Sequence, residues 1–141
     1  MIIIIIYGCM TLCCCLYAAL LGGLSGRIGA LIILLRAIGT LIASWCDPSF
    51  QGTAYPLLAI ETAASMAFLA LALSSNRLWP LWSCACQLLA TLIHVATIWQ
   101  PDVTPKIYQA MQNLWVFPMQ LFMILGITLD QMRSRPSRHP A

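Results

Sequence analysis

Apolar residues fill five long stretches of this chain, and short polar segments separate them. A helix that crosses about 30 Å of hydrocarbon at about 1.5 Å per residue needs roughly 20 mainly apolar residues. Stretches of this kind are 2–21, 28–46, 56–74, 79–99 and 108–129. The breaks read GGLSGR, DPSFQGTAY, SSNRL and QPDVTPKI, which are typical of turns. The pattern predicts an all-α integral membrane bundle of five transmembrane helices.

Prolines occupy two kinds of position in this pattern. Pro56 and Pro80 fall in the first turn of a predicted span, where the missing N–H costs no hydrogen bond. Pro118 lies in the middle of the last span, where it leaves the carbonyl of Leu114 without its usual partner. A kink at Pro118 is consistent with a cavity beside the helix and equally consistent with ordinary helix packing.

Composition agrees with a membrane location. Of the 141 residues, 61% are hydrophobic and 8% are charged, and the mean hydropathy is +0.87. A soluble domain carries about a quarter charged residues, so this chain has too little charge to cover a water-facing surface. The N-terminal stretch has no basic residue before its apolar run and no A-x-A-like cleavage site. We therefore expect a retained span there and not a signal peptide.

Basic residues predict the orientation, because cytoplasmic loops retain Lys and Arg. With the C-terminus inside, Arg27 and Arg77 join the arginines of the tail on the cytoplasmic side, and only Lys106 lies outside. The opposite orientation reverses this count. An odd number of spans then gives an N-out/C-in topology, with residues 1–129 as a single transmembrane domain and 130–141 as a short basic cytoplasmic tail.

Aromatic residues agree with these boundaries, since amphipathic rings prefer the membrane interfaces. Trp45, Tyr55, Trp99 and Tyr108 would line the outer interface, and Trp79 and Trp82 the inner one.

Polar side chains recur on one side of several spans, as expected if they face the interior of the bundle. Counted from the predicted span ends, they fall at two depths. The outer level contains Glu61, His94 and Asn113, and a level near mid-membrane contains Arg36, Gln87 and Gln120. We interpret the second set as a polar core of the bundle.

Arg36 is expected to lie beside Gln87, which shares its depth and helix direction. Direct pairing with Glu61, the only acidic residue well inside a span, is disfavoured because the two depths differ by about five residues and side chains lean toward the N-terminus of their own helix. That lean sends Arg36 and Glu61 in opposite directions. The alternative is that Arg36 reaches along its own stem to the inner headgroups.

Glu61 and His94 form the pair with the clearer functional implication, since a buried carboxylate and a neighbouring imidazole can share a proton. The functional hypothesis is a proton-accepting or ligand-holding site that opens toward the outer face, with Asn113 as a hydrogen-bond partner. The structural alternative is an interhelical hydrogen bond that fixes packing.

The sequence offers no support for a catalytic, metal or cofactor site. It contains no phosphate loop, nucleophile elbow or paired carboxylates. Cys13, Cys14 and Cys15 lie inside an apolar run, where cysteine behaves as a small hydrophobe. Cys84 and Cys86 are two residues apart, which places their side chains on different sides of a helix and gives no zinc-type ligand pair. A single intramembrane histidine argues against a bis-histidine haem. We expect no cofactor, no metal and no nucleic-acid partner.

Residues 77–102, RLWPLWSCACQLLATLIHVATIWQPD, resemble small uncharacterised multi-spanning bacterial inner-membrane proteins. The shared features are an Arg-x-Trp-Pro-Leu-Trp entry to a span, here Arg77 to Trp82, followed by Gln87 and then His94. The resemblance implies a multi-pass protein of the bacterial inner (cytoplasmic) membrane, and it brings no activity with it.

The expected function is that of a non-enzymatic accessory or interaction subunit of a larger membrane assembly, because the chain is small and its loops are short. Its partners would then be the lipid bilayer and other membrane protein subunits or further copies of itself. The alternative is a small transporter or channel, acting alone or as an oligomer, that uses Glu61 and His94. A redox or lipid-modifying enzyme with His94 at its site is a third class.

Overall fold

The computed structural model contains five α-helices and no strand within residues 2–46, 54–99 and 105–134, the parts of the chain that it describes. Side chains are described within these ranges except at residues 2–4, 44, 46, 54, 97 and 105–113. The helices are α1 (Ile2–Leu21), α2 (Gly23–Cys46), α3 (Ala54–Ser74), α4 (Trp79–Trp99) and α5 (Pro105–Ser134). The prediction of an all-α bundle is confirmed.

Four of the helices are long and apolar enough to cross a membrane. These segments are Gly23–Ala43, Tyr55–Ser74, Trp79–Ala96 and Leu114–Ser134. In α1 the apolar part with described side chains, Ile5–Leu21, is shorter than a span. Bulky apolar side chains point away from the bundle, such as Leu20 at 76% exposed and Leu73 at 81%. Such a surface suits lipid, so the chain is a multi-spanning protein of membrane type.

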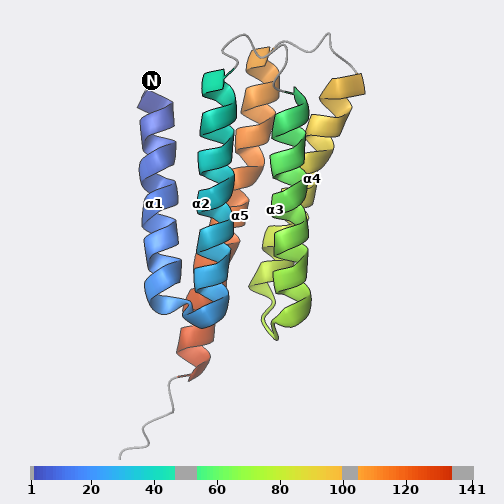
Figure 1. Ribbon diagram of the computed structural model, residues 1–141. Helices are drawn as coiled ribbons and strands as arrows, with labels where there is room; N and C mark the ends of the chain where they lie inside the picture. The colour runs from blue at the N-terminus through green and yellow to red at the C-terminus, as the bar shows by residue number, and fades with distance from the viewer. Residues whose placement is uncertain (1, 47–53, 100–104, 135–141) are drawn as a thin grey trace, which may run out of the picture.

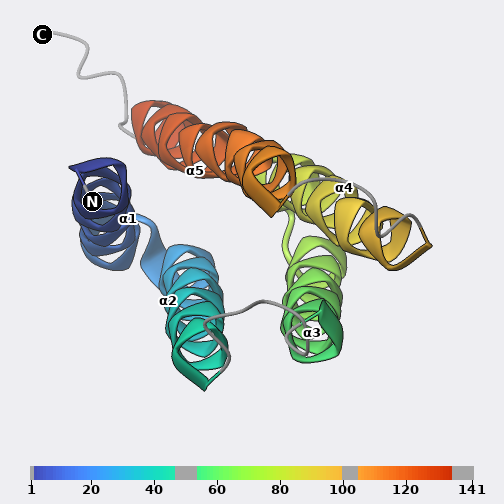
Figure 2. The same ribbon diagram turned by 90° about the horizontal axis from the view of Figure 1, so that it is seen from above.

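Successive helices run in opposite directions and form a ring in sequence order. Each helix packs against the next, and α5 returns to pack against α1 and touches α2. Figure 1 shows the alternation of direction, and Figure 2, seen from above, shows α5 lying obliquely along α4 with its C-terminal end toward α1. The first and last helices of the chain therefore close the ring.

The connection between α1 and α2 is shorter than predicted. We expected a flexible turn up to Arg27, but α2 already begins at Gly23, and only Gly22 separates the helices. Gly23 has a φ of +61°, a conformation that favours glycine. A Cβ on Gly22 would lie 2.5 Å from the carbonyl oxygen of Ala18 and 2.6 Å from the Cα of Gly26. The two glycines allow a sharp reversal, because another residue would clash at position 22 and would have a strained backbone at position 23.

Helix α5 is longer at both ends than the apolar pattern indicated. It begins at Pro105, a favoured residue for a first helical turn, and it continues to Ser134 into the segment predicted as tail. Tertiary contacts hold this last part: Asp130 forms an ion pair with Arg77 at 2.9 Å, and the Gln131 amide donates to the Leu21 carbonyl at 2.7 Å. Residues 135–141 lie outside the described residues.

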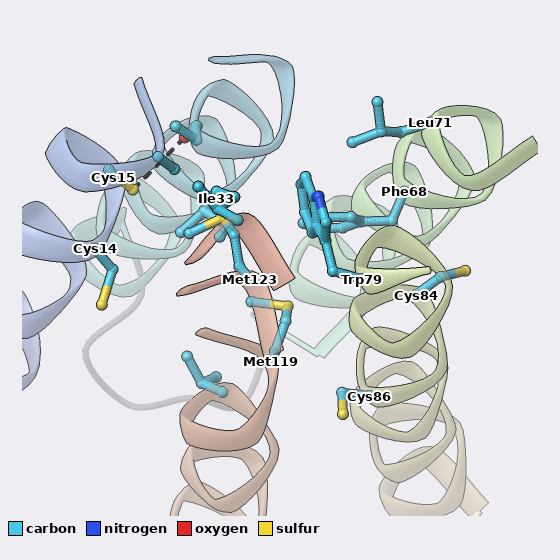
Figure 3. Close-up of a cluster of buried hydrophobic side chains, with 14 residues drawn as sticks. Cys14, Cys15, Ile33, Phe68, Leu71, Trp79, Cys84, Cys86, Met119 and Met123 are labelled. Carbon is cyan, nitrogen blue, oxygen red and sulfur yellow. Dashed lines mark hydrogen bonds between the residues drawn. The ribbon is translucent and has the colours of Figure 1, made fainter. Parts of the chain in front are cut away.

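Trp79 lies inside the bundle and not at the inner interface, where we expected it. Its side chain is 3% exposed and packs in an apolar core that includes Ile33, Phe68 and Met123 (Figure 3). Added Cβ atoms on Gly29 and Gly126 would lie 2.8 Å from its Cη2 and 2.6 Å from its Cγ.

The missing side chains of Gly29 on α2 and Gly126 on α5 therefore make room for the indole, an arrangement that we call the Trp79 layer. The indole N–H has no hydrogen-bond partner among the described residues. By contrast, Trp45, Tyr55 and Trp99 are at least 70% exposed, as a position at a membrane interface requires.

Candidate functional site

Four polar side chains from three helices meet inside the bundle, and we call them the carboxylate cluster. They are Arg36 on α2, Glu61 on α3, and Gln87 and His94 on α4. Arg36 is 7% exposed and each of the others is 1% exposed. Helical spacing explains why they turn inward, since on α3 Glu61 shares its buried face with Leu57, Ser65 and Phe68. The helix pairs α2–α3 and α3–α4 pack together, which brings the three faces into contact.

Arg36 and Glu61 form a buried two-point ion pair. Nη2 of Arg36 lies 2.7 Å from Oε1 of Glu61, and its Nε donates to Oε2 at 2.9 Å. Such fork geometry satisfies both carboxylate oxygens and is among the strongest polar contacts in proteins. The Tyr7 side chain of α1 also lies close to Arg36.

The expectation that depth and lean keep Arg36 and Glu61 apart is therefore wrong. Helix α3 begins at Ala54 and not at 56, so Glu61 lies deeper in the bundle than the predicted span end implied. The long arginine side chain can span the difference in depth that remains between Arg36 and Glu61. Attraction between opposite charges is also strong in a medium of low dielectric constant. The depth and the lean of a side chain describe a rigid side chain without a partner, whereas Arg36 and Glu61 are flexible and attract each other.

Gln87 and His94 approach the same carboxylate. The Gln87 amide donates to Oε2 of Glu61 at 2.5 Å, so Gln87 is a partner of the carboxylate where we expected a partner of Arg36. Nε2 of His94 lies 3.9 Å from Oε1, which is close for an ionic contact but too long for a hydrogen bond. The structure thus brings Glu61 and His94 together and adds Arg36 to them.

Hydroxyl groups of α3 and α4 extend the cluster by one helical turn. Ser65 Oγ and Thr91 Oγ1 are 2.7 Å apart, so one hydroxyl donates to the other. Each also lies within hydrogen-bond distance of a carbonyl of its own helix, that of Glu61 at 2.9 Å and that of Gln87 at 3.0 Å. These groups join α3 to α4 beside the carboxylate. Both hydroxyls lie on the polar sides of their helices, as the sequence pattern indicated. Tyr7 was missed, although Thr11, one helical turn further along α1, marks the inward face of that helix.

Gln120 lies apart from the cluster, in a second polar contact that we call the α1–α5 seam. Its amide nitrogen donates to Thr11 Oγ1 at 2.8 Å, and its buried Oε1 has no partner within the described ranges. Further along the seam, Tyr17 and Thr128 share a hydrogen bond of 2.7 Å. The predicted grouping of Gln120 with Arg36 and Gln87 is therefore not what the structure shows.

Asn113, the third member of the predicted outer level, belongs to α5, but its side chain lies outside the described residues. Within the side chains that are described, no group of three or more His, Cys, Asp and Glu residues could hold a metal ion. Six cysteines with described side chains are free thiols. The chemistry that the cluster offers is therefore that of one carboxylate, its fixed cationic partner and a nearby imidazole.

Comparison with known protein families, with curated proteins and with solved structures yields no match for this chain. The fold and the cluster define its class: a helical protein of membrane type with a buried ion pair among its span-length helices.

Proposed function

We propose that this chain is a non-enzymatic accessory or interaction subunit of a larger assembly in the bacterial inner membrane. The outward face of α3 is the observation that carries the proposal. Its first half presents small exposed residues, Ala59, Thr62 and Ala63, and Ala70 follows two turns later. Thr62 donates to the Leu58 carbonyl at 2.7 Å, so its hydroxyl is satisfied within its own helix. Small residues at such spacing let the backbone of another transmembrane helix approach closely.

The carboxylate cluster supports the same proposal. Arg36 and Glu61 are paired with each other inside the bundle. On the described part of α3 the outward face is uncharged, so a partner helix would recognise it by close packing and not by charge. Association within a bilayer relies on van der Waals contact of this kind, since lipid tails are as apolar as leucine.

The proposed topology has five spans with the N-terminus outside. Helix α1 contains 20 residues, which corresponds to about 30 Å and matches the hydrocarbon thickness. The α1–α2 turn, the α3–α4 turn and the end of α5 lie at the same end of the bundle (Figure 1). This end carries Arg27 near the start of α2, Arg77 in the α3–α4 turn and Arg133 near the end of α5. This excess of arginine supports a cytoplasmic location for that end. A cytoplasm-active reporter fused after Ala141 should be active, and its inactivity would overturn the orientation.

The test of the interaction role compares two alanine-to-leucine variants on exposed faces. Ala63→Leu fills the outward face of α3, whereas Ala85→Leu makes the same change on the exposed face of α4. We expect the wild-type protein, solubilised from its own membrane in mild detergent, to form a complex of defined mass. Ala63→Leu should reduce the amount of that complex at least several-fold, and Ala85→Leu should not. A monomeric wild-type protein, or equal behaviour of the two variants, would refute the proposal.

A second candidate is a small transporter or channel, and the contact between His94 and Glu61 favours it. A carboxylate and an imidazole 3.9 Å apart inside the bundle can pass a proton between them once they close to hydrogen-bond distance. In proteoliposomes this candidate requires a pH-dependent flux that Glu61→Gln abolishes and that Thr62→Ser, on the exposed outward face of the same helix, leaves unchanged. An impermeable wild-type protein would exclude it.

A further inference from the structure

We infer that Glu61 is a proton-binding site and that a proton bound there displaces Arg36, which then moves along its own helix toward the arginine-rich end of the bundle. The ligand is the proton itself, and the consequence is a looser contact between α2 and α3. This inference shares with the transport candidate only the requirement that Glu61 takes up a proton. It does not require a flux, and it is compatible with the accessory role.

The hydrogen bonds of the carboxylate show why proton and arginine compete. Oε1 of Glu61 faces Nη2 of Arg36, and Oε2 accepts from Nε of Arg36 and from Gln87. A proton that binds to Oε1 forms an O–H bond and turns an acceptor into a donor. The contact with Nη2 is then lost, because two donors face each other. The neutral ion pair becomes a neutral acid beside an uncompensated guanidinium.

His94 provides the route for this proton. Its Nε2 lies 3.9 Å from Oε1, the same oxygen that Nη2 of Arg36 occupies. An imidazolium at His94 that moves within hydrogen-bond distance of Oε1 can release its Nε2 proton to that oxygen. The imidazole then returns to its neutral form, and the carboxylate becomes an acid. His94 also lies nearer than Gln87 to Trp99, where α4 ends, so the proton would arrive from that end of the bundle.

The groups around Glu61 leave Arg36 as its principal charge partner. Tyr7 of α1 faces Arg36, and His94 of α4 faces Glu61. The charged side chains described on α5, Asp130 and Arg133, lie at the opposite end of the bundle, where Asp130 pairs with Arg77. No described acidic side chain besides Glu61 is therefore placed to hold Arg36 in the cluster.

A released Arg36 has a defined destination. A guanidinium that loses its partner inside the bundle is strongly disfavoured. Side chains tend to lean toward the N-terminus of their own helix, so a released Arg36 can carry its charge along its stem toward headgroups at the end where Arg27 lies. The α2–α3 contact would then rest on packing such as that of Gly39, where an added Cβ would lie 3.3 Å from Cδ1 of Ile60.

The sequence permits a direct test, because Glu61 is the only glutamate of the chain. Protein labelled with [δ-13C]glutamate and [15N]arginine is reconstituted in lipid bilayers and studied by solid-state NMR between pH 8 and pH 4. The single carboxyl signal reports the protonation of Glu61. Dipolar coupling from that carbon to guanidinium nitrogens reports the Arg36 contact, and the Arg77–Asp130 pair does not interfere because Asp130 is unlabelled.

At pH 8 we expect an ionised carboxyl signal with strong coupling to arginine. On acidification the signal should move to the position of the neutral acid, and the coupling should disappear over the same pH range. His94→Gln should shift the midpoint, whereas His139→Gln, which changes the other histidine, should not.

Two results would overturn the inference, and a third would overturn the route through His94. A signal that stays ionised down to pH 4 excludes proton binding at Glu61. A signal that titrates while the coupling persists shows that Arg36 is not displaced. Equal midpoints in the two histidine variants remove His94 from the route. Absence of flux in proteoliposomes would count against the transport candidate alone.

Discussion

The carboxylate cluster and the Trp79 layer both join α2 to α4, the first together with α3 and the second together with α5, but they do so by different physical means. In the cluster, charge compensation decides the arrangement, since Arg36, Glu61 and Gln87 are each buried only because the others satisfy them. In the Trp79 layer, volume decides it, since Gly29 and Gly126 leave the space that the indole fills. The carboxylate cluster therefore depends on each of its partners and can change when a proton is added. The Trp79 layer contains no charged group, so it changes only if the volume of a side chain changes.

Removal of the indole should have the largest effect. Trp79→Ala is expected to lower the free energy of unfolding by about 3–5 kcal/mol, because a large cavity would open between α2 and α5. Trp79→Phe should cost far less, since the indole N–H makes no hydrogen bond among described residues that could be lost. SDS titration in mixed micelles, followed by circular dichroism, measures both. Trp82→Ala is the control, because Trp82 is 55% exposed, and an equal loss there would contradict the volume argument.

Loss of the Glu61 carboxylate should cause the second-largest loss in the free energy of unfolding. Glu61→Ala is expected to cost about 3 kcal/mol, at the lower end for breaking a buried ion pair, because the stem of Arg36 can carry its charge toward headgroups. The double variant Arg36→Met/Glu61→Leu should recover most of that loss in the same titration. If the double variant is less stable than the single one, charge compensation is not what governs the cluster.

Added volume in the Trp79 layer should rank third. Gly126→Ala is expected to cost about 2 kcal/mol, because the new methyl group would meet the indole and force the helices apart. Gly8→Ala is the matched control, since an added Cβ there has nothing within 4 Å. The difference between the two unfolding free energies isolates the clash, and equal values would show that the bundle adjusts freely.

The α1–α5 seam should show the smallest effect. Thr11→Val removes the hydrogen bond from Gln120 and is expected to cost about 0.6 kcal/mol, the average for interhelical hydrogen bonds in membranes. Thr62→Val, at an exposed position of α3, is the control. A loss above about 2 kcal/mol would exceed the measured range of such bonds and would place the seam alongside the cluster in importance.

The apolar pattern was sufficient to predict the helices, because a span needs a minimum length and polar breaks mark its ends. Helices α1 and α4 have the predicted bounds. The errors arose where tertiary contacts or glycine geometry extend a helix beyond its apolar part. Helix α2 starts earlier because Gly23 permits a sharp reversal, and α5 ends later because Asp130 and Gln131 bind neighbouring segments.

The polar residues of the site were identifiable from the sequence, but their pairing was not. Helical stripes indicated that Glu61, His94, Arg36 and Gln87 turn inward. Counting depth from span ends then separated Arg36 from Glu61, because the count is sensitive to a shift of two residues and ignores the reach of a long side chain. Trp79 was misplaced for a related reason: sequence periodicity does not reveal that glycines on two other helices face it.

The order of the helices in the ring has a consequence for how the protein enters the membrane. A lone arginine or acidic residue at the centre of a helix opposes insertion by about 2.5–3.5 kcal/mol on the translocon scale. Arg36 and Glu61 belong to consecutive helices, so this hairpin can enter the bilayer as an electrically neutral unit while the rest of the chain is still being synthesised. The α1–α5 seam must wait for the final helix. Assembly would therefore begin with the ion pair and end with the closure of the ring.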